Sequence, residues 1–151
     1  MGFDIHRLVS DRPLLLGGVK IPGPKGLLGH SDADVLLHAL CDALLGAVGA
    51  GDIGTYFPDT DPQWKNTSSR IFVEKTMELV KSKGLEISNV DLTAITEEPK
   101  LSPHRKNIVQ SIAQILQVGP EQVNLKARTM EGLGSIGAGE AMAAYAVVLL
   151  E

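Results

Sequence analysis

Hydrophobic and polar residues alternate along this chain with two periods, which together predict a mixed fold. Apolar residues every three or four positions predict helices, and short apolar or alternating runs bounded by turn residues predict strands. The predicted order is strand, hairpin, helix, helix, strand, helix, strand, strand, at residues 4–6, 13–22, 31–49, 67–84, 90–96, 104–118, 123–129 and 141–150. We expect one domain, 1–151, of the α+β (α/β sandwich-like) class, with a mixed four- to five-stranded sheet and helices on one face.

The helix expected to begin near Ser31 carries several polar side chains. Ser31 is a good N-cap and Asp34 stands three residues later, so we expect this pair to form a capping box. Asp34, His38 and Asp42 are four apart, which predicts a polar stripe along the helix. Gly49 or Gly51 marks its predicted end.

At the start of the chain, Asp4 and His6 are two positions apart and would share one face of a strand. With His38 from the helix they form a three-ligand set that suits zinc and leaves a fourth position open for water or a phosphate oxygen. This arrangement is typical of catalytic sites. The competing interpretation is that Asp-x-His is a short pattern and that a helical histidine more often bonds a neighbour than a metal.

Composition and charge narrow the possible partners. Aromatic residues make up 4%, the net charge is −4 and no basic run exists, so we expect no nucleic-acid partner. The longest apolar run, 141–150, is half of the ~20 residues that a membrane helix needs, so we expect no membrane partner. Cys41 is the only cysteine, which excludes a disulfide framework and favours a buried thiol. No signal peptide is visible, and because the chain begins inside a strand motif we expect a shortened N-terminus.

Three predicted loops carry further candidate residues. The loop 52–62 is either a solvated connector or a flexible cover in which Asp52 binds hydroxyl groups. Lys100 follows a predicted strand and is either solvated or a phosphate ligand. The glycine-rich loop 130–139 could offer backbone N–H groups to a phosphate. Glu131 in that loop would repel the phosphate unless a hard cation such as magnesium or manganese lies between them.

Several sequence blocks in one order resemble a known protein family. They are Gly2-Phe-Asp4-x-His6, Gly29-His30-Ser31-Asp32-x-Asp34-x-x-x-His38, Asp52-Ile-Gly54, Phe57-Pro-Asp-Thr-Asp61, and Pro99-Lys100 with Pro103-His104. From residue 2 to residue 150, the chain resembles the 2-C-methyl-D-erythritol 2,4-cyclodiphosphate synthases of the non-mevalonate isoprenoid pathway. The resemblance implies a phosphorus-oxygen lyase, in the bacterial cytoplasm or in the plastid stroma of a plant or alga.

The resemblance also implies the reaction and the assembly. The substrate would be 4-diphosphocytidyl-2-C-methyl-D-erythritol 2-phosphate, whose 2-phosphate attacks its own β-phosphate and releases CMP. Neither water nor an enzyme nucleophile would take part. The assembly would be a homotrimer packed sheet to sheet about a threefold axis, with active sites between subunits. The final strand, 141–150, agrees with this because both of its faces are apolar.

By resemblance, Asp4, His6 and His38 would bind zinc, and Glu131 would bind magnesium or manganese. Transition-state stabilisation would fall to His30 and Thr129. The implied substrate-binding residues are Ser31, Asp52, Ile53, Gly54, Phe57, Pro58, Asp59, Thr60, Asp61, Pro99, Lys100, Leu101 and Arg128. Among them, Asp52 and Gly54 would hold the erythritol hydroxyls, and the loop 96–102 would form a cytidine pocket for the adjacent subunit.

Four positions depart from the pattern common in the family. Ala138 stands where many members have an arginine, and Ser135 stands where many have an aromatic residue, both near a central cavity that can hold isoprenoid diphosphates. We therefore expect normal cyclisation but weak binding of geranyl or farnesyl diphosphate. Arg128 and Met130 flank Thr129 where small hydroxyl residues are common, which predicts altered phosphate contacts on that side.

Two other functions fit the same residues. A zinc-dependent nucleotide phosphohydrolase would use the same three ligands with a metal-bound hydroxide as nucleophile, and it would release free phosphate. A non-catalytic trimeric binding protein would keep the fold without the chemistry. The intact set of Asp4, His6, His38 and Glu131 disfavours the second alternative, because these acids would be a liability without metals.

Overall fold

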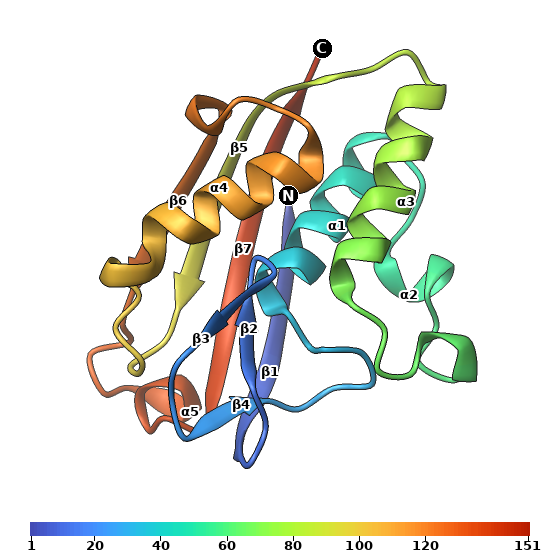
Figure 1. Cartoon of the computed structure of the whole chain (residues 1–151). Helices are drawn as coiled ribbons and strands as arrows, with labels where there is room; N and C mark the ends of the chain where they lie inside the picture. The colour runs from blue at the N-terminus through green and yellow to red at the C-terminus, as the bar shows by residue number, and fades with distance from the viewer.

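A five-stranded mixed sheet forms the centre of the fold (Figure 1). In the computed structural model, which describes residues 1–151, the strands are β1 (Gly2–Ser10), β2 (Leu14–Leu16), β3 (Val19–Ile21), β4 (Lys25–Leu27), β5 (Ile87–Ile95), β6 (Val123–Arg128) and β7 (Ala141–Leu150). The α-helices are α1 (Val35–Ala47), α2 (Ile53–Tyr56), α3 (Ser69–Ser82), α4 (Arg105–Leu116) and α5 (Gly134–Gly137), and the 3-10 helices are η1 (Pro62–Trp64), η2 (Ser102–His104) and η3 (Pro120–Gln122). The sheet order is β4-β1-β7-β5-β6, with only β5 and β6 parallel.

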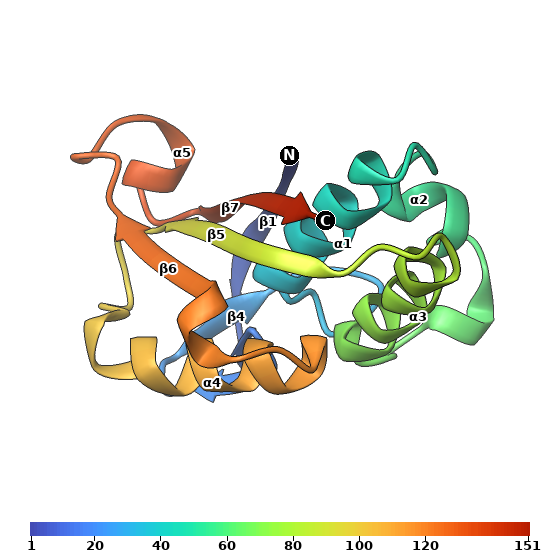
Figure 2. The ribbon, with the colours of Figure 1, turned by 90° about the horizontal axis from the view of Figure 1, so that it is seen from above.

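The long helices gather on one side of the sheet, as the sequence predicted. Helix α1 packs on β1 and β7, and α4 packs on β6. The view from above shows α1 and α4 on the same side of the sheet (Figure 2). Helix α3 was expected to cover the sheet, but it packs mainly on α1. This leaves α1 enclosed between the sheet and α3, which explains why most of its side chains are apolar and buried.

The cap of α1 differs from the prediction. Ser31 does not cap this helix; Asp34 does, because its Oδ1 accepts a hydrogen bond of 3.1 Å from the backbone N–H of Leu37. Nor does Asp34 lie on a polar stripe, since it is fully buried. The turn between β2 and β3 covers it, and its carboxylate accepts backbone N–H bonds from Gly17 at 2.9 Å and Gly18 at 2.7 Å. Asp34 therefore joins the hairpin to α1.

Short elements occupy segments that were predicted to be irregular. The segment 52–62 contains α2 and the start of η1, each opened by an aspartate cap. Asp52 Oδ1 accepts the N–H of Thr55 at 2.8 Å, and Asp61 Oδ1 accepts the N–H of Gln63 at 3.0 Å. These elements span about one turn, too short for an apolar period to appear in the sequence. The glycine-rich loop likewise contains α5.

The face of the sheet opposite the helices carries an uncovered apolar strip. It consists of Phe3, Ile5, Tyr145, Val147 and Leu149, whose exposed fractions lie between 40% and 61%. Phe3 and Tyr145 are paired across β1 and β7, with ring centroids 4.8 Å apart. The other face of the same strands belongs to the core. None of the helices is both long enough and apolar enough to cross a membrane.

Candidate metal centre

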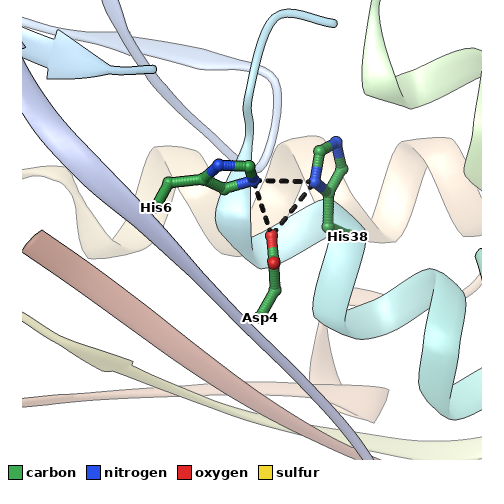
Figure 3. Close-up of side chains that lie close together, drawn as sticks. All are labelled: Asp4, His6 and His38. Atoms are coloured by element: carbon green, nitrogen blue, oxygen red, sulfur yellow. Dashed lines mark hydrogen bonds and ion pairs between the residues drawn. The ribbon is translucent and has the colours of Figure 1, made fainter. Parts of the chain in front are cut away.

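A close approach of β1 to α1 builds the candidate metal centre. Gly2 makes this approach possible, because a Cβ atom there would lie 2.0 Å from the carbonyl oxygen of Ala39 and 2.6 Å from the backbone nitrogen of Ala43. Asp4 and His6 follow on the same face of β1, as the period of two predicted. They therefore face α1, from which His38 projects (Figure 3).

Asp4, His6 and His38 place three potential ligand atoms in a small triangle (Figure 3). Oδ2 of Asp4 is 2.9 Å from Nε2 of His6 and 3.0 Å from Nδ1 of His38, and these two nitrogens are 3.1 Å apart. Ligand atoms that lie about 2.0–2.1 Å from a tetrahedral zinc ion are about 3.3 Å from one another. The triangle is only slightly smaller than that. The three residues therefore fit zinc in size and in donor chemistry.

The outer nitrogen of each histidine is already engaged, which leaves the inner nitrogen for a metal. Nδ1 of His6 donates to the carbonyl oxygen of Leu28 at 2.9 Å. Nε2 of His38 lies 2.8 Å from the hydroxyl of Ser69 and 3.1 Å from that of Ser31. Hydrogen bonds of this kind fix the tautomer and the ring orientation of metal-binding histidines. Both rings are thus held ready to bind a metal.

The electrostatics of the triad favour an ionised aspartate. Burial alone would raise the pKa of Asp4, but hydrogen bonds with His38 and His6 bring this pKa well below its usual range. Burial alone would lower the pKa of His6, but its hydrogen bond with Asp4 raises this pKa above the ordinary value. The site therefore offers a carboxylate, the form that binds metals.

The predicted substrate segment from residue 52 to residue 61 lies near this centre. His30 Nε2 lies 3.2 Å from the carbonyl oxygen of Asp61. Phe57 stacks on Phe72 with ring centroids 4.6 Å apart, and Phe72 in turn lies 6.1 Å from the His38 ring. Gly54, Asp59 and Thr60 are exposed, whereas Ile53 and Pro58 are half-buried. An aromatic contact thus connects this segment to the metal centre.

Ser31 and Asp52 occupy different settings near the same centre. Ser31 is buried and turns its hydroxyl inward, where it accepts a hydrogen bond from the N–H of Ala33 at 3.1 Å. Asp52 is exposed, and hydrogen bonds from the hydroxyl and the backbone of Thr55 lower the pKa of its carboxyl. Asp52 can therefore accept hydrogen bonds from a ligand as a carboxylate.

The other predicted residues lie at or after the carboxyl ends of β5 and β6, of which β6 forms the edge of the sheet far from the triad. Thr129 and Glu131 follow β6, and the Thr129 hydroxyl donates to Glu131 Oε1 at 2.8 Å. Two strands, β7 and β5, separate β6 from β1 in the sheet. No hydrogen bond or ion pair joins these two residues to the triad of the same chain. Pro99 and Lys100 lie on the loop between β5 and η2.

A pocket of about 300 Å³ opens at this far edge. Its lining consists of Leu101, Ser102, Arg105, Leu125, Lys126, Ala127 and Arg128. Two of these residues, Leu101 and Arg128, belong to the predicted substrate set. No sequence pattern indicated Arg105, which donates to Asn124 Oδ1 at 3.1 Å. Ser69 was missed as well, because a serine at a helix start is normally explained by capping.

The fold and the triad together define an α+β protein with a candidate mononuclear Asp-His-His metal centre. The YgbB family model matches residues 1–151. A 2-C-methyl-D-erythritol 2,4-cyclodiphosphate synthase from Nostoc sp. is 55% identical over 149 residues, which cover 99% of this chain and 90% of that protein. One from Desulfatibacillum aliphaticivorans is 56% identical over 150 residues, with coverages of 99% and 97%.

Solved structures agree with these sequence relatives. A 2C-methyl-D-erythritol-2,4-cyclodiphosphate synthase in a CDP-bound form matches with a TM-score of 0.92 and 45% identity, covering 99% of this chain and 97% of that one. The bifunctional IspDF from Campylobacter jejuni matches with a TM-score of 0.95 and 43% identity, and this chain spans 40% of its length. This chain therefore belongs to the YgbB family, that of the 2-C-methyl-D-erythritol 2,4-cyclodiphosphate synthases.

Proposed function

We propose that this protein converts 4-diphosphocytidyl-2-C-methyl-D-erythritol 2-phosphate into the 2,4-cyclodiphosphate and CMP, with residues 1–151 as one catalytic domain. An oxygen of the 2-phosphate forms a bond to the β-phosphorus. The bond from that phosphorus to the oxygen bridging the α- and β-phosphates breaks, and its electron pair leaves with CMP. The observation that carries this proposal is the Asp4-His6-His38 triad, held in a chain that matches these synthases along almost its whole length.

The metals of this reaction would be held by residues from two parts of the fold. Asp4, His6 and His38 would hold zinc, which when bound would supply a Lewis acid to the β-phosphate. Glu131 would hold magnesium or manganese, and that cation would offset the repulsion between the Glu131 carboxylate and the phosphates. Phosphoryl transfer depends mainly on positioning and on charge neutralisation, so this division suits the reaction.

The chain's own residues would orient the substrate around these metals. Asp52, exposed and readily ionised, would accept hydrogen bonds from the erythritol hydroxyls, with Gly54 beside it on α2. His30 and Thr129 would donate to the oxygens that gain charge in the transition state. The engagement of His30 Nε2 with the carbonyl of Asp61 supports a fixed ring orientation.

The pocket beside β6 would hold the cytidine diphosphate part. Three of its lining residues, Arg105, Lys126 and Arg128, are cations, and none is a carboxylate. Such a pocket suits a phosphorylated nucleotide. Two related synthase structures are described as CDP complexes, which supports the same ligand class for this protein.

A homotrimer would bring the two halves of the site together. Within one chain the triad and the nucleotide pocket lie at separated strands of the sheet. The uncovered apolar strip supplies a surface for packing against neighbouring copies. Each active site would then combine the triad of one subunit with the pocket of the next. The bacterial relatives support a place in the bacterial cytoplasm.

Nucleotide analysis tests this proposal directly. Purified protein with the cytidyl substrate, magnesium and zinc should release CMP, as measured by liquid chromatography, and should form one equivalent of the cyclic diphosphate. Removal of metals with a chelator should abolish release, and added zinc with magnesium should restore it. Accumulation of inorganic phosphate instead would favour the zinc phosphohydrolase.

A further inference from the structure

A buried hydroxyl contacts the ring nitrogen of His38 that faces away from the triad. Ser69, the first residue of α3, is fully buried, and its Oγ lies 2.8 Å from Nε2 of His38. The hydroxyl of Ser69 is also hydrogen-bonded to the Oδ1 of Asp32. A chain of side chains therefore runs from a carboxylate through a hydroxyl to the imidazole of a candidate metal ligand.

The chemistry of the three side chains allows only one direction for the hydrogen bonds that link Asp32, Ser69 and His38. A carboxylate can only accept hydrogen bonds, so the Ser69 hydroxyl is the donor in its hydrogen bond with Asp32. The Ser69 oxygen is then left as an acceptor toward His38. With a metal at the triad, Nε2 of His38 would consequently carry the proton, and its Nδ1, which faces Asp4 and His6, would offer a lone pair to the metal. This is the tautomer that a metal at the triad requires.

Asp32 is itself fixed by backbone groups from both helices. Its Oδ2 accepts the N–H of Ser69 at 3.0 Å, and its Oδ1 accepts the N–H of Asp34 at 3.2 Å. Its own N–H donates to the carbonyl oxygen of Thr67 at 3.0 Å. The carboxylate thus lies at the N-terminus of α3, where the helix dipole favours a negative charge. It cannot turn away from Ser69 without losing these bonds.

We propose that Ser69 and Asp32 are positioning residues for the metal centre, a conclusion that rests on zinc binding in the proposed function. Asp32 accepts the hydrogen bond of the Ser69 hydroxyl and so fixes its direction. Ser69 in turn keeps His38 in the orientation that binds a metal through Nδ1, and it makes that nitrogen a stronger electron-pair donor to the metal. His6 needs no such side chain, because the carbonyl of Leu28 fixes its ring. Ser31 also lies near Nε2 of His38, at the longer distance of 3.1 Å.

Zinc affinity, measured by competition with a chromophoric chelator, tests this proposal. Ser69→Ala should weaken zinc binding by about 10- to 100-fold, the usual effect of removing a hydrogen-bond partner behind a metal-binding histidine. Ser68→Ala is the matched control, because Ser68 is exposed and its side chain makes no capping bond. It should bind zinc as tightly as the wild type.

A double-mutant cycle separates positioning from general damage to the fold. Asp32→Asn should weaken zinc binding when Ser69 is present and have little further effect in Ser69→Ala, because Asp32 reaches His38 only through Ser69. Any loss of stability from the cap of α3 should occur in both backgrounds. Cobalt-substituted protein should report the same change as a shift of its visible absorption bands in both single variants.

The outcomes distinguish the two levels of the proposal. Zinc affinity of Ser69→Ala within twofold of the wild type, or equal effects of Asp32→Asn in both backgrounds, would overturn the positioning role while leaving the proposed function intact. A wild-type protein that binds no zinc would overturn the zinc site of the proposed function itself.

Discussion

His38 connects α1 to the strand that carries the other two candidate ligands. Its substitution tests whether the triad serves chemistry rather than folding. His38→Ala should lose bound zinc and lower turnover by at least a thousandfold, because a metal that supplies several kcal/mol of charge stabilisation would be missing. The protein should stay folded, since its core consists of apolar side chains outside the triad. Metal analysis, turnover and thermal unfolding check the three parts.

His104→Ala provides the matched control for that experiment. This histidine lies on η2 and its side chain makes no hydrogen bond, so zinc content should be unchanged. Turnover by His38→Ala without bound zinc would contradict the assignment of the triad.

Asp34 should give the stability of the protein a specific pH dependence. Burial raises the pKa of this carboxyl from 3.8 to about 6, although three backbone N–H groups donate to it. The folded protein therefore holds this proton more tightly than the unfolded chain. The resulting stabilisation is complete below pH 3.8 and disappears as the pH rises through about 6. Its size is about 3 kcal/mol.

Asp34→Asn isolates this contribution because the amide does not titrate. The free energy of unfolding, measured by urea denaturation at fixed protein and zinc concentrations, should fall with rising pH more steeply in the wild type than in the variant. The steeper part should lie between about pH 4 and pH 6.5. A difference between the two proteins that stays constant over this range would refute the raised pKa.

Single residues differed in how far the sequence could reveal them. The triad was predictable because a spacing of two fixes a shared strand face and because few side chains bind zinc. Ser69 was not, since its role depends on α3 lying beside α1, a long-range contact. The cap of α1 was predicted wrongly for a similar reason: Asp34 is buried by a turn 16 residues away in the chain. Local preference favoured Ser31 equally well.

At the level of elements, the contact between β1 and α1 sets the geometry of the metal centre. Gly2→Ala should push these elements apart, because the new methyl group would meet backbone atoms of α1 that cannot turn aside. Overpacking of this kind costs about 1–3 kcal/mol. Unfolding measurements should show this loss together with weaker zinc binding.

Gly46→Ala supplies a control of opposite sign in α1, the helix that Gly2 contacts. A Cβ atom at Gly46 meets nothing within 4 Å, and the residue is exposed within α1. Alanine should therefore raise the free energy of unfolding by about 0.5–1 kcal/mol. Zinc affinity should not change. If Gly2→Ala were as stable as the wild type, close packing would not set the position of β1.

Long elements were predictable and short ones were not. The final strand, β7, has the predicted bounds, 141–150. Each end of α3 and of α4 lies within two residues of its predicted position. These segments contain enough periods to reveal their type. Strand β4 contains three residues, including a glycine, and exists because β1 pairs with it. Its sequence carries no strand signal of its own, because it directly follows the turn residues Gly23 and Pro24.

At the level of the whole molecule, the proposed trimer can be tested by complementation. His38→Ala and Glu131→Ala should each be inactive alone. Co-expressed in equal amounts and assembled at random, they should give mixed trimers in which one site of the three combines an intact triad from one subunit with an intact Glu131 from the next, which is about a quarter of all sites in the mixture. Turnover of the purified mixture should therefore approach a quarter of the wild-type value. Complete inactivity of verified mixed trimers would place both residues of each site in one subunit.

The class of the fold followed from the sequence, but its topology did not. Alternating strands and helices predicted an α+β domain, and the apolar strands predicted a sheet with one face for the core. Strand β7 lies between β1 and β5, and its pairing with β1 joins residues more than a hundred positions apart. No local pattern encodes that pairing, and the separation of the triad from Glu131 within one chain follows from it.

Phosphorus NMR of the reaction in water enriched with oxygen-18 tests the central claim most directly. The proposed reaction should convert the substrate into two coupled resonances of a cyclic diphosphate with one equivalent of CMP. Neither product should show an isotope shift, because the 2-phosphate and not water is the nucleophile. Phosphate resonances shifted by one incorporated oxygen-18, without the coupled pair, would contradict the claim and identify a hydrolase.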